Sequence, residues 1–409
     1  MESNTIADSI FLTLGIMILI PCLMFFVECL AAFSLKEPSV QISSSSSLSL
    51  KNIPRPKTTI LIPAHNEAAQ ITEVIQVLQA QLTEQDQVIV IADNCHDDTA
   101  ELARGTGVTV LERSHKTDRG KGYALAYAME QIQDHPPEVL VILDGDCIIE
   151  PDTIKNITCQ AIATGRPVQA TYLMEQPDNP SLTDSISMFS LKVKNLVRLL
   201  GLHRLGWHSL LTGSGMAFPW PLISQVSLAG SKTTDDMQLT VDLALAGSTP
   251  TFCEHALVMG RLMKDQDAQS QRSRWEHGHL EMILVEVPRL VTGFIKTGRW
   301  AALGLALDIL IPPLSLLVLA WIASLIIFWL IAIFTAVSSI PAIVVTVAGG
   351  FLLTGVLLAW SKFGRTDLPF GSLVAIPFYI LGKIPIYLKF LVNPQSRWLK
   401  TERDLPNDH

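Results

Sequence analysis

Apolar residues dominate both ends of the chain, whereas its middle alternates between short apolar runs and polar segments. Residues 10–33 are apolar apart from Glu28, and a helix of that length spans a bilayer. Residues 302–334, with Asp308 as their one charged side chain, and the uncharged residues 340–360 have the same character. This pattern predicts a transmembrane helix near the N-terminus and a hairpin of two transmembrane helices towards the C-terminus.

The last apolar stretch, residues 368–392, differs because it contains Lys383, Lys389 and three prolines. Basic residues also lie on both sides of it, and positive charge at both ends favours a helix in the membrane interface over one that crosses. We therefore expect a re-entrant or interfacial helix here, three crossings in all, and a cytosolic tail over residues 393–409. Residues 268–300 are expected to form interfacial amphipathic helices.

Charges on the two sides of the first apolar stretch indicate which way it runs. Glu2 and Asp8 precede it, whereas Lys36 and Lys51 follow it. Because positive charge is retained on the cytosolic side of a membrane, we expect everything between Lys36 and the hairpin to be cytosolic. A cleaved signal peptide is disfavoured, since it would need basic residues before the apolar run.

The middle of the chain has the pattern of an α/β domain. A serine run and two prolines mark residues 34–56 as a flexible linker, and from 57 to 267 short apolar runs alternate with helical periodicity. The predicted strands are 59–62, 87–91, 108–111 and 139–143, and the predicted helices are 68–80, 99–104 and 123–132. Such runs indicate a parallel sheet with helices on both faces, which binds its ligand at the carboxyl ends of the strands.

Polar residues follow the predicted strands where that ligand would bind. Residues 63–67 follow the first strand, residues 93–98 follow the second, and Asp144-Gly145-Asp146 follows the fourth. Any one of these loops could be ordinary turn chemistry, because Asp and Asn favour turns and helix caps. Several of them at one edge of a sheet indicate a site.

The pair Asp144 and Asp146 has the pattern of a metal site. The two carboxylates follow a buried strand with a glycine between them, so both can turn to one side and share a cation. Carboxylate oxygens suit Mg²⁺ or Mn²⁺, and such an ion would neutralise the charge on a departing nucleoside diphosphate. Lys121 would add a second positive charge, although its glycine-flanked segment lacks the spacing of a Walker loop.

Two later segments contain further candidates. Gly213, Ser214 and Gly215 form a loop of small residues, which lets a bulky polar ligand approach the backbone or else forms a tight turn. Asp235 and Asp236 begin an amphipathic helix. Acids at that position cap the helix and complement its dipole, and the same geometry can hold a general base.

A last polar segment precedes the C-terminal membrane helices. It contains Gln271, Arg274 and Trp275, followed by His277 and His279. The two histidines could suggest a metal, but no third ligand has suitable spacing, so we prefer a structural role for them.

Composition removes several classes of function. The chain has 409 residues with 30 Lys and Arg against 38 Asp and Glu, a net charge of −8 that argues against binding a nucleic acid backbone. Hydrophobic residues make up 49% and charged residues only 17%, which indicates a soluble domain with membrane-spanning ends. The six cysteines include no C-x-x-C pair, so neither a zinc ribbon nor a disulfide framework is expected.

Taken in order, these features resemble the membrane-bound members of glycosyltransferase family 2. The shared features are the N-terminal anchor, the acid after the second strand, the Asp-x-Asp at 144–146, the acidic pair at 235–236, the Gln-x-x-Arg-Trp at 271–275 and the membrane helices. Cellulose, hyaluronan and chitin synthases belong to that group, as do ceramide glucosyltransferases and bacterial exopolysaccharide transferases. The resemblance implies a cytosolic catalytic domain of the GT-A (Rossmann-like) fold in a multi-pass protein of the cell inner (cytoplasmic) membrane.

The resemblance also implies roles for individual residues. The nucleotide sugar would be bound by Pro63, Asn66, Glu67, Asp93, Lys121, Asp144 and Asp146. Asp144 and Asp146 would be the metal ligands. Asp236 matches the second acid of the family's Glu-Asp pair, the general base, and Asp235 stands in place of the usual Glu. The acceptor and the diphosphate would be held by Gly213, Ser214, Gly215, Gln271, Arg274 and Trp275.

The implied function is an inverting, metal-dependent transfer of a hexose from a nucleotide sugar, a UDP-sugar by resemblance. The acceptor would be a polysaccharide or a lipid-linked sugar in cell-surface or exopolysaccharide synthesis, with membrane lipids and other pathway proteins as partners. One alternative is a glycolipid synthase like ceramide glucosyltransferase. Another, from a different class, is a non-catalytic membrane scaffold that binds nucleotide sugars. A transporter is disfavoured, because its binding residues should lie at the membrane midplane.

Overall fold

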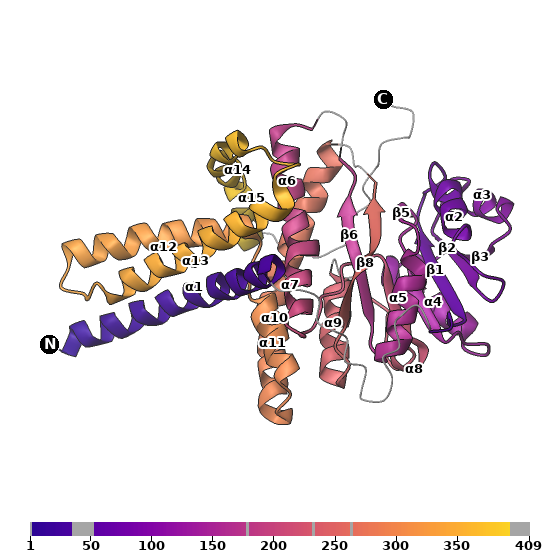
Figure 1. The fold of residues 1–409 in the computed structure, drawn as a ribbon, viewed down its shortest axis with the longest axis horizontal. Helices are drawn as coiled ribbons and strands as arrows, with labels where there is room; N and C mark the ends of the chain where they lie inside the picture. Colours follow the sequence, from indigo (N-terminus) through magenta and orange to yellow (C-terminus); the bar gives the residue numbers. More distant parts are fainter. Residues whose placement is uncertain (1, 35–52, 177–179, 231–233, 262–264, 393–409) are drawn as a thin grey trace. The chain divides into compact units, whose positions relative to one another are not determined.

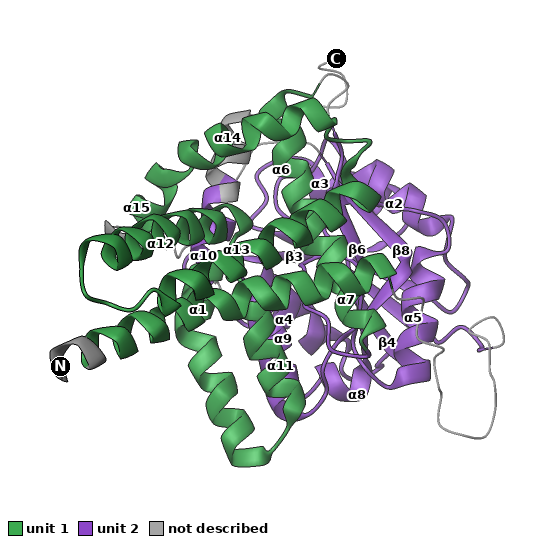
Figure 2. Cartoon of the chain, turned by 60° about the vertical axis from the view of Figure 1, so that its left-hand side comes forward, with its two compact units in different colours: residues 1–37, 178–205, 279–395 green, residues 38–177, 206–278, 396–409 purple. Residues whose placement is uncertain are grey.

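The computed structural model describes residues 2–34, 53–176, 180–230, 234–261 and 265–392 (Figure 1). Most of the predicted linker and the whole predicted tail lie outside these residues. The chain divides into two compact units, which Figure 2 shows in different colours. We call residues 38–177, 206–278 and 396–409 the sheet unit, and residues 1–37, 178–205 and 279–395 the helical unit.

This division differs from the domain that we expected over residues 57–267. Residues 178–205 come from the middle of that range, yet they group with the helical unit. They form α6 (Leu182–Lys192), the π-helix η2 (Val193–Arg198) and α7 (Leu199–Arg204), which carry many buried apolar side chains. A short apolar helix looks the same in a sequence whichever core it packs into, so the pattern did not reveal this grouping.

One mixed, mostly parallel sheet forms the centre of the sheet unit. Within the described residues its eight strands have the order β3-β2-β1-β4-β7-β6-β8-β5. The parallel half consists of β1 (Thr58–Ala64), β2 (Gln87–Asp93), β3 (Thr109–Arg113) and β4 (Val139–Ile142). The remaining strands are β5 (Cys147–Ile149), β6 (Val168–Met174), β7 (Met216–Pro219) and β8 (Thr251–Gly260). β7 is antiparallel to β4 and β6, while β8 is parallel to β6 and antiparallel to β5. This α/β sheet confirms the predicted fold class.

Helices cover both faces of this sheet. They are α2 (Ile71–Gln79), α3 (Thr99–Gly105), α4 (Lys121–Ile132), α5 (Thr153–Thr164), α8 (Trp220–Ile223) and α9 (Asp235–Ala246). Leu61 and Leu140 pack in one core with Leu125 of α4 and with α9. Ile60 and Val90 point to the opposite face and are also fully buried. Burial on both faces explains why the strands appear in the sequence as continuous apolar runs.

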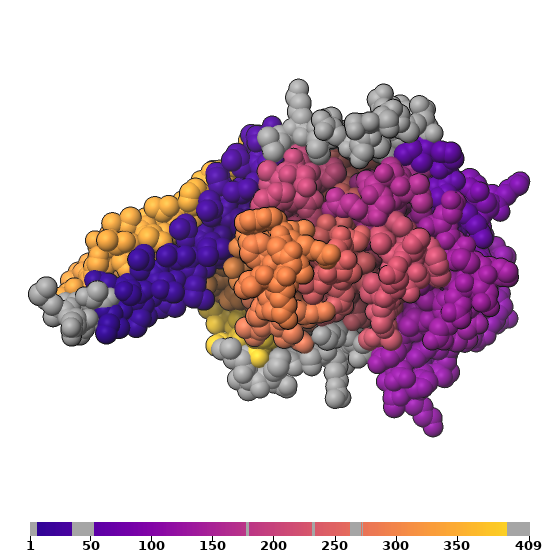
Figure 3. Space-filling model, turned by 90° about the horizontal axis from the view of Figure 1, so that it is seen from below, coloured from indigo at the N-terminus to yellow at the C-terminus, as the bar shows by residue number. Residues whose placement is uncertain are grey.

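Long apolar helices make up most of the helical unit. They include α1 (Glu2–Ser34), α12 (Leu314–Phe334) and α13 (Ile340–Ala359), which lie side by side (Figures 1 and 3). Phe11 of α1 meets Phe328 of α12 edge to face, with ring centroids 5.5 Å apart. The Trp321 indole donates a hydrogen bond to the Val345 carbonyl at 3.0 Å. The shorter segments are α11 (Trp300–Ile309), η3 (Trp360–Gly364), η4 (Phe370–Ala375), α14 (Ile376–Gly382) and α15 (Ile384–Val392).

Four segments of the described chain are long and apolar enough to cross a membrane. They are Ile6–Ser34, Leu314–Phe334, Ile340–Gly364 and Phe370–Phe390. The first three overlap the stretches that we expected to cross, and their length and composition allow it. The fourth is the stretch that we expected to be re-entrant or interfacial, and length and composition alone also allow it to cross. Whether this fourth segment lies in the membrane interface or crosses the membrane therefore stays a prediction.

Proline accounts for two differences from the expected helices. We expected one helix over residues 302–334, but the chain breaks between α11 and α12 at Pro312 and Pro313. The last apolar stretch is likewise divided, with Pro377 and Pro385 in the first turns of α14 and α15. Proline lacks an amide hydrogen and disfavours a helical residue before it, so helices end ahead of it and can restart at it. Residues 268–300, expected as several helices, lie mostly in the single helix α10 (Asp265–Thr297), within which the sheet unit ends.

Three buried charged residues meet in the helical unit. The Arg198 guanidinium donates a hydrogen bond from Nε to Glu28 at 2.6 Å, and its other end bonds the Asp308 carboxylate and, at 3.0 Å, the Asp308 carbonyl. All three side chains are almost completely buried. A buried charge is tolerated when it is paired, which explains the two acids that interrupt otherwise apolar helices.

Candidate active site

The carboxyl ends of neighbouring parallel strands carry the first group of candidate residues. Asp93, the last residue of β2, accepts hydrogen bonds at Oδ1 from the Arg113 guanidinium at 2.7 Å and from the Asn94 amide at 3.0 Å. Arg113 ends β3, the next strand in the sheet. Arg113 is not among the predicted site residues, although a cation at a strand end beside a predicted ligand contact is a signal that could have identified it.

The loop after β1 is joined to the loop after β2. Asn66 has a positive φ of 56°, and its side-chain oxygen accepts a hydrogen bond from the His96 amide at 2.8 Å. The Glu67 amide donates to Thr99 at 2.8 Å. Pro63, which we expected after the strand, lies within β1. These bonds hold the two loops together next to Asp93.

Lys121 connects three segments of the sheet unit. It is the first residue of α4, and its ammonium donates hydrogen bonds to the Asp144 carboxylate and to the Gly213 carbonyl. Ser214, the next residue, accepts a hydrogen bond from the Asp144 amide at 3.0 Å. The small-residue loop and the Asp-x-Asp segment, 70 residues apart in sequence, are therefore in contact.

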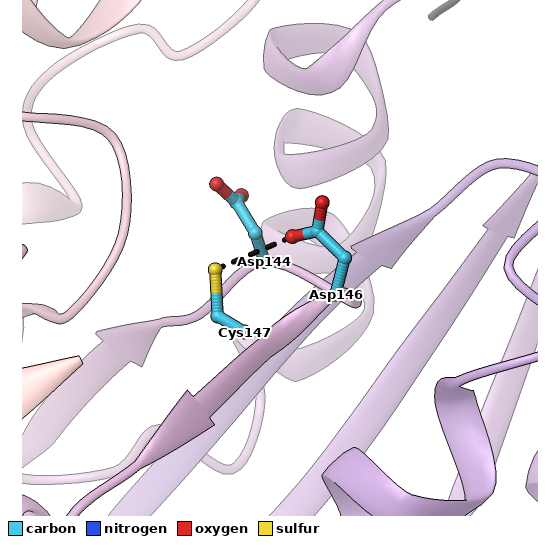
Figure 4. A group of neighbouring side chains, drawn as sticks. All are labelled: Asp144, Asp146 and Cys147. Carbon is cyan, nitrogen blue, oxygen red and sulfur yellow. Dashed lines mark hydrogen bonds between the residues drawn. The ribbon is translucent and has the colours of Figure 1, made fainter. Parts of the chain in front are cut away.

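Asp144, Asp146 and Cys147 form the one group among the described residues whose ligand atoms are close enough to share a metal, within 4.8 Å of one another. Figure 4 shows the two carboxylates turned towards the same side. Burial, and after it the charge of Asp144, raises the pKa of the Cys147 thiol to about 12, so this sulfur stays protonated at neutral pH. Two of the three groups are hard carboxylates, which fit Mg²⁺ or Mn²⁺ better than a thiophilic ion.

Asp236 lies beside the same loop. It is the second residue of α9, and its Oδ1 accepts a hydrogen bond from the Met237 amide at 2.8 Å. A Cβ atom added to Gly213 would lie 3.6 Å from Asp236 Oδ2, and Gly213 has a φ of 98° that favours glycine. Asp235 is directed elsewhere, since its Oδ1 would be 3.5 Å from a Cβ added to Gly230. Of the two acids, Asp236 therefore adjoins the loop residue that accepts from Lys121.

Gln169 holds this loop in place. The fully buried amide donates to the Ser214 carbonyl at 2.9 Å and accepts from the Thr212 amide at 2.8 Å. Gln169 is not among the predicted site residues either. Its one signal was a polar side chain inside a buried strand, which is uncommon unless the side chain is hydrogen-bonded.

The segment 271–275 belongs to α10 and to the part of that helix in the sheet unit. Gln271 and Arg274 are buried, and Trp275 is partly exposed. Burial lowers the pKa of the Arg274 guanidinium. Further along the helix, His279 Nε2 donates to the Ile309 carbonyl at 3.0 Å, and both of these residues belong to the helical unit.

Comparisons with known proteins agree with this architecture. Residues 54–278 match the family described as glycosyltransferase like family 2. The structure of mannosyltransferase PcManGT from Pyrobaculum calidifontis in complex with GDP-Man and Mn²⁺ is similar with a TM-score of 0.54 and 18% identity, covering 95% of this chain and 99% of that chain. At such an identity the likeness shows the fold alone.

A second similar structure is glucosyl-3-phosphoglycerate synthase from Mycobacterium tuberculosis in complex with Mn²⁺, UDP and phosphoglyceric acid. Its TM-score is 0.39 and its identity 16%, covering 60% of this chain and 84% of that chain. No curated protein matches the sequence.

Proposed function

Because the chain belongs to glycosyltransferase like family 2, we propose that it transfers a hexose from a nucleotide sugar to an acceptor at the membrane, with inversion of the anomeric carbon. Membership of the family makes it a glycosyltransferase; the donor, the acceptor and the residue roles are what we propose. The observation that carries the proposal is the meeting of Lys121, Asp144 and Asp236 around Gly213.

We assign Asp144 and Asp146 to a divalent cation, Mg²⁺ or Mn²⁺. The support is the pair of carboxylates turned to one side of the chain, whose hard oxygen atoms are the ligands that these ions prefer. When bound, the cation would neutralise the charge that develops on the departing diphosphate. Lys121 adds a positive charge at the same place and can donate a hydrogen bond to a phosphate oxygen.

Asp236 acts as the general base in this proposal. Its Oδ2 takes the proton of the acceptor hydroxyl while the hydroxyl oxygen forms a bond to the anomeric carbon. The bond between that carbon and the diphosphate oxygen breaks at the same time, and its electron pair leaves with the nucleoside diphosphate. A single displacement inverts the anomeric carbon and needs no covalent nucleophile.

The nucleoside would bind at the carboxyl ends of β1 and β2 and the loops that follow them, where Pro63, Asn66, Glu67 and Asp93 lie. Resemblance to the family favours uridine. The Pyrobaculum mannosyltransferase structure contains GDP-Man, so a guanosine donor belongs in any test. Gln271, Arg274 and Trp275 would close over the diphosphate, with the indole stacked on the acceptor sugar.

The helices that can span a membrane support an acceptor presented at the lipid surface. We propose that the protein is a multi-pass protein of the inner membrane with its sheet unit in the cytosol. Its acceptor would be a growing polysaccharide or a lipid-linked sugar. Lys36, Lys51, Lys362 and Arg365 support this orientation, because positive charge is retained on the cytosolic side.

The test uses the full-length chain in detergent with Mn²⁺ and a panel of radiolabelled UDP- and GDP-sugars. Products are separated into free sugar, lipid-extractable glycolipid and high-molecular-weight polymer. We expect transfer from one donor that requires the metal, is lost in Asp146→Asn and is retained in the exposed control Asp134→Asn. Failure of every donor, with metal and acceptor lipids supplied, would contradict the proposal and favour a non-catalytic scaffold.

A further inference from the structure

A chain of hydrogen bonds leads from Asp146 into the interior of the sheet unit. The Cys147 thiol donates to Asp146 Oδ1 with an S to O distance of 3.3 Å (Figure 4). The Tyr172 hydroxyl lies 3.9 Å from the same sulfur. Cys147 is 1% exposed, Asp146 2% and Tyr172 8%, so water does not compete for these contacts.

Tyr172 reaches Cys147 across an intervening strand. The sheet order is β6-β8-β5, so β8 separates the strand of Tyr172 from the strand of Cys147. Cys147 and Met174 are both in register with Gly260, the last residue of β8. A Cβ atom added to Gly260 would lie 2.9 Å from the Tyr172 hydroxyl oxygen. Only a residue without a side chain leaves this hydroxyl room to cross the strand.

The direction of the hydrogen bonds follows from the groups involved. An ionised carboxylate only accepts, so the single thiol proton is donated to Asp146. With its proton donated to Asp146, the sulfur can meet the Tyr172 hydroxyl only as an acceptor; the single proton of that hydroxyl has two sulfur acceptors within reach, Cys147 Sγ and Met174 Sδ, each 3.9 Å from the hydroxyl oxygen. Of the two sulfurs, only that of Cys147 also hydrogen-bonds Asp146, the carboxylate that we assign to the metal.

We propose that Cys147 and Tyr172 are positioning residues that fix the rotation of the Asp146 carboxylate for metal binding. The torsion that turns a carboxylate is soft, so a directed donor on one oxygen determines where the other points. Groups that hydrogen-bond a metal ligand set its orientation, and their loss commonly weakens metal affinity. This inference depends on the proposed function, because it assumes that Asp146 is a metal ligand.

The test is a titration of the full-length protein with Mn²⁺ alone. Electron paramagnetic resonance measures the concentration of free Mn²⁺ at each step. Removing such a partner costs about ten- to a hundredfold in metal affinity, and we expect Cys147→Ala and Tyr172→Phe at the lower end of that range because sulfur hydrogen bonds are weak. The double variant should bind no more weakly than Cys147→Ala, because Tyr172 acts through the sulfur. Tyr127→Phe, which removes a hydroxyl from α4, is the matched control and should bind normally.

Two further variants make each outcome decisive. Cys147→Ser retains a donor and acceptor at the same position, so it should bind Mn²⁺ more tightly than Cys147→Ala. This comparison does not depend on whether Tyr172→Phe folds. Wild-type affinity in a folded Tyr172→Phe, losses that multiply in the double variant, or equal affinities of the serine and alanine variants would overturn the inference. Asp146→Asn distinguishes failure of the proposed metal site from failure of the positioning roles. Normal Mn²⁺ binding by Asp146→Asn would contradict the metal site itself. Loss of binding in Asp146→Asn together with normal binding in Tyr172→Phe would contradict only the positioning roles.

Discussion

The Arg113 guanidinium donates a hydrogen bond to Asp93 Oδ1 at 2.7 Å, joining the carboxyl ends of two neighbouring strands. Both side chains are mostly buried. Asn94 donates to the same oxygen, so Asp93 Oδ2 receives no hydrogen bond from the part of the chain that the structure describes. Arg113 therefore fixes the orientation of the Asp93 carboxylate, and the position of Oδ2 fits the nucleoside contact that we propose for Asp93.

Removing this partner should weaken nucleotide binding. We predict that Arg113→Met lowers the affinity for the nucleotide by about tenfold or more, because a hydrogen bond between charged groups contributes roughly 1.5–3 kcal/mol. Isothermal titration calorimetry with UDP and GDP measures the effect. Arg104→Met is the control, since Arg104 forms only an exposed ion pair with Glu112. Equal affinities of the two variants would show that Arg113 does not organise the nucleoside site.

Lys121 should matter for the chemical step. Removing one preorganised donor from a site of developing negative charge costs about 10²–10³ in kcat, and we predict a loss of that size for Lys121→Met. Steady-state transfer assays measure it at saturating donor. Lys155→Met removes an exposed lysine of α5 and should leave kcat unaltered. A normal kcat in Lys121→Met would mean that Lys121 only holds the loop at Gly213.

His279 should make the protein less stable in acid. Burial lowers the pKa of His279 from 6.5 to about 3, and the positive charges of Lys194 and Arg198 lower it further. The Ile309 carbonyl and Asp308 act in the opposite direction but are outweighed. Between these values the unfolded chain binds a proton that the folded protein does not, so stability falls as pH decreases through this window. The slope from this residue is about 1.4 kcal/mol per pH unit. Thermal unfolding from pH 7 to pH 4 should show a shallower decline in His279→Gln than in the wild type, and parallel curves would exclude this role.

The charged cluster in the helical unit gives a prediction with a built-in control. Arg198→Met leaves Glu28 and Asp308 buried without their cation, which should destabilise the protein by about 3–5 kcal/mol. Glu28→Gln should cost less, because Arg198 keeps Asp308 as a partner. The triple variant Glu28→Gln/Arg198→Met/Asp308→Asn should be more stable than Arg198→Met alone. Thermal unfolding in detergent measures all three, and an Arg198→Met protein as stable as the wild type would contradict the pairing.

The half of the sheet that could be predicted is the half with a local signal. β1, β2 and β4 are buried on both faces, so each appears as a continuous apolar run, whereas β3 is a partly exposed edge strand. Parallel pairing brings the acids that follow these strands to one edge. The other four strands have a weaker local sequence pattern. β5 and β7 are short, and β6 and β8 pair over a register shift between Ala170 and Thr171. No local pattern encodes such pairing.

The site residues likewise divide into those that a sequence motif identifies and those that it does not. The contact between Lys121 and Asp144 involves two residues that the motifs had already singled out. Arg113 and Gln169 act through partners that are distant in sequence, and no motif includes them. Finding them required the sheet order and the side-chain geometry.

Asp236 is, as we propose, the general base of a transfer reaction at the Gly213 loop. The most direct measurement compares donor binding and transfer in Asp236→Asn, with Asp235→Asn as the adjacent control. General bases contribute about 10²–10⁴ in rate, so we predict that Asp236→Asn binds the metal and the nucleotide sugar normally and loses transfer by at least that factor, while Asp235→Asn keeps most of its transfer. Wild-type transfer by Asp236→Asn would contradict the account.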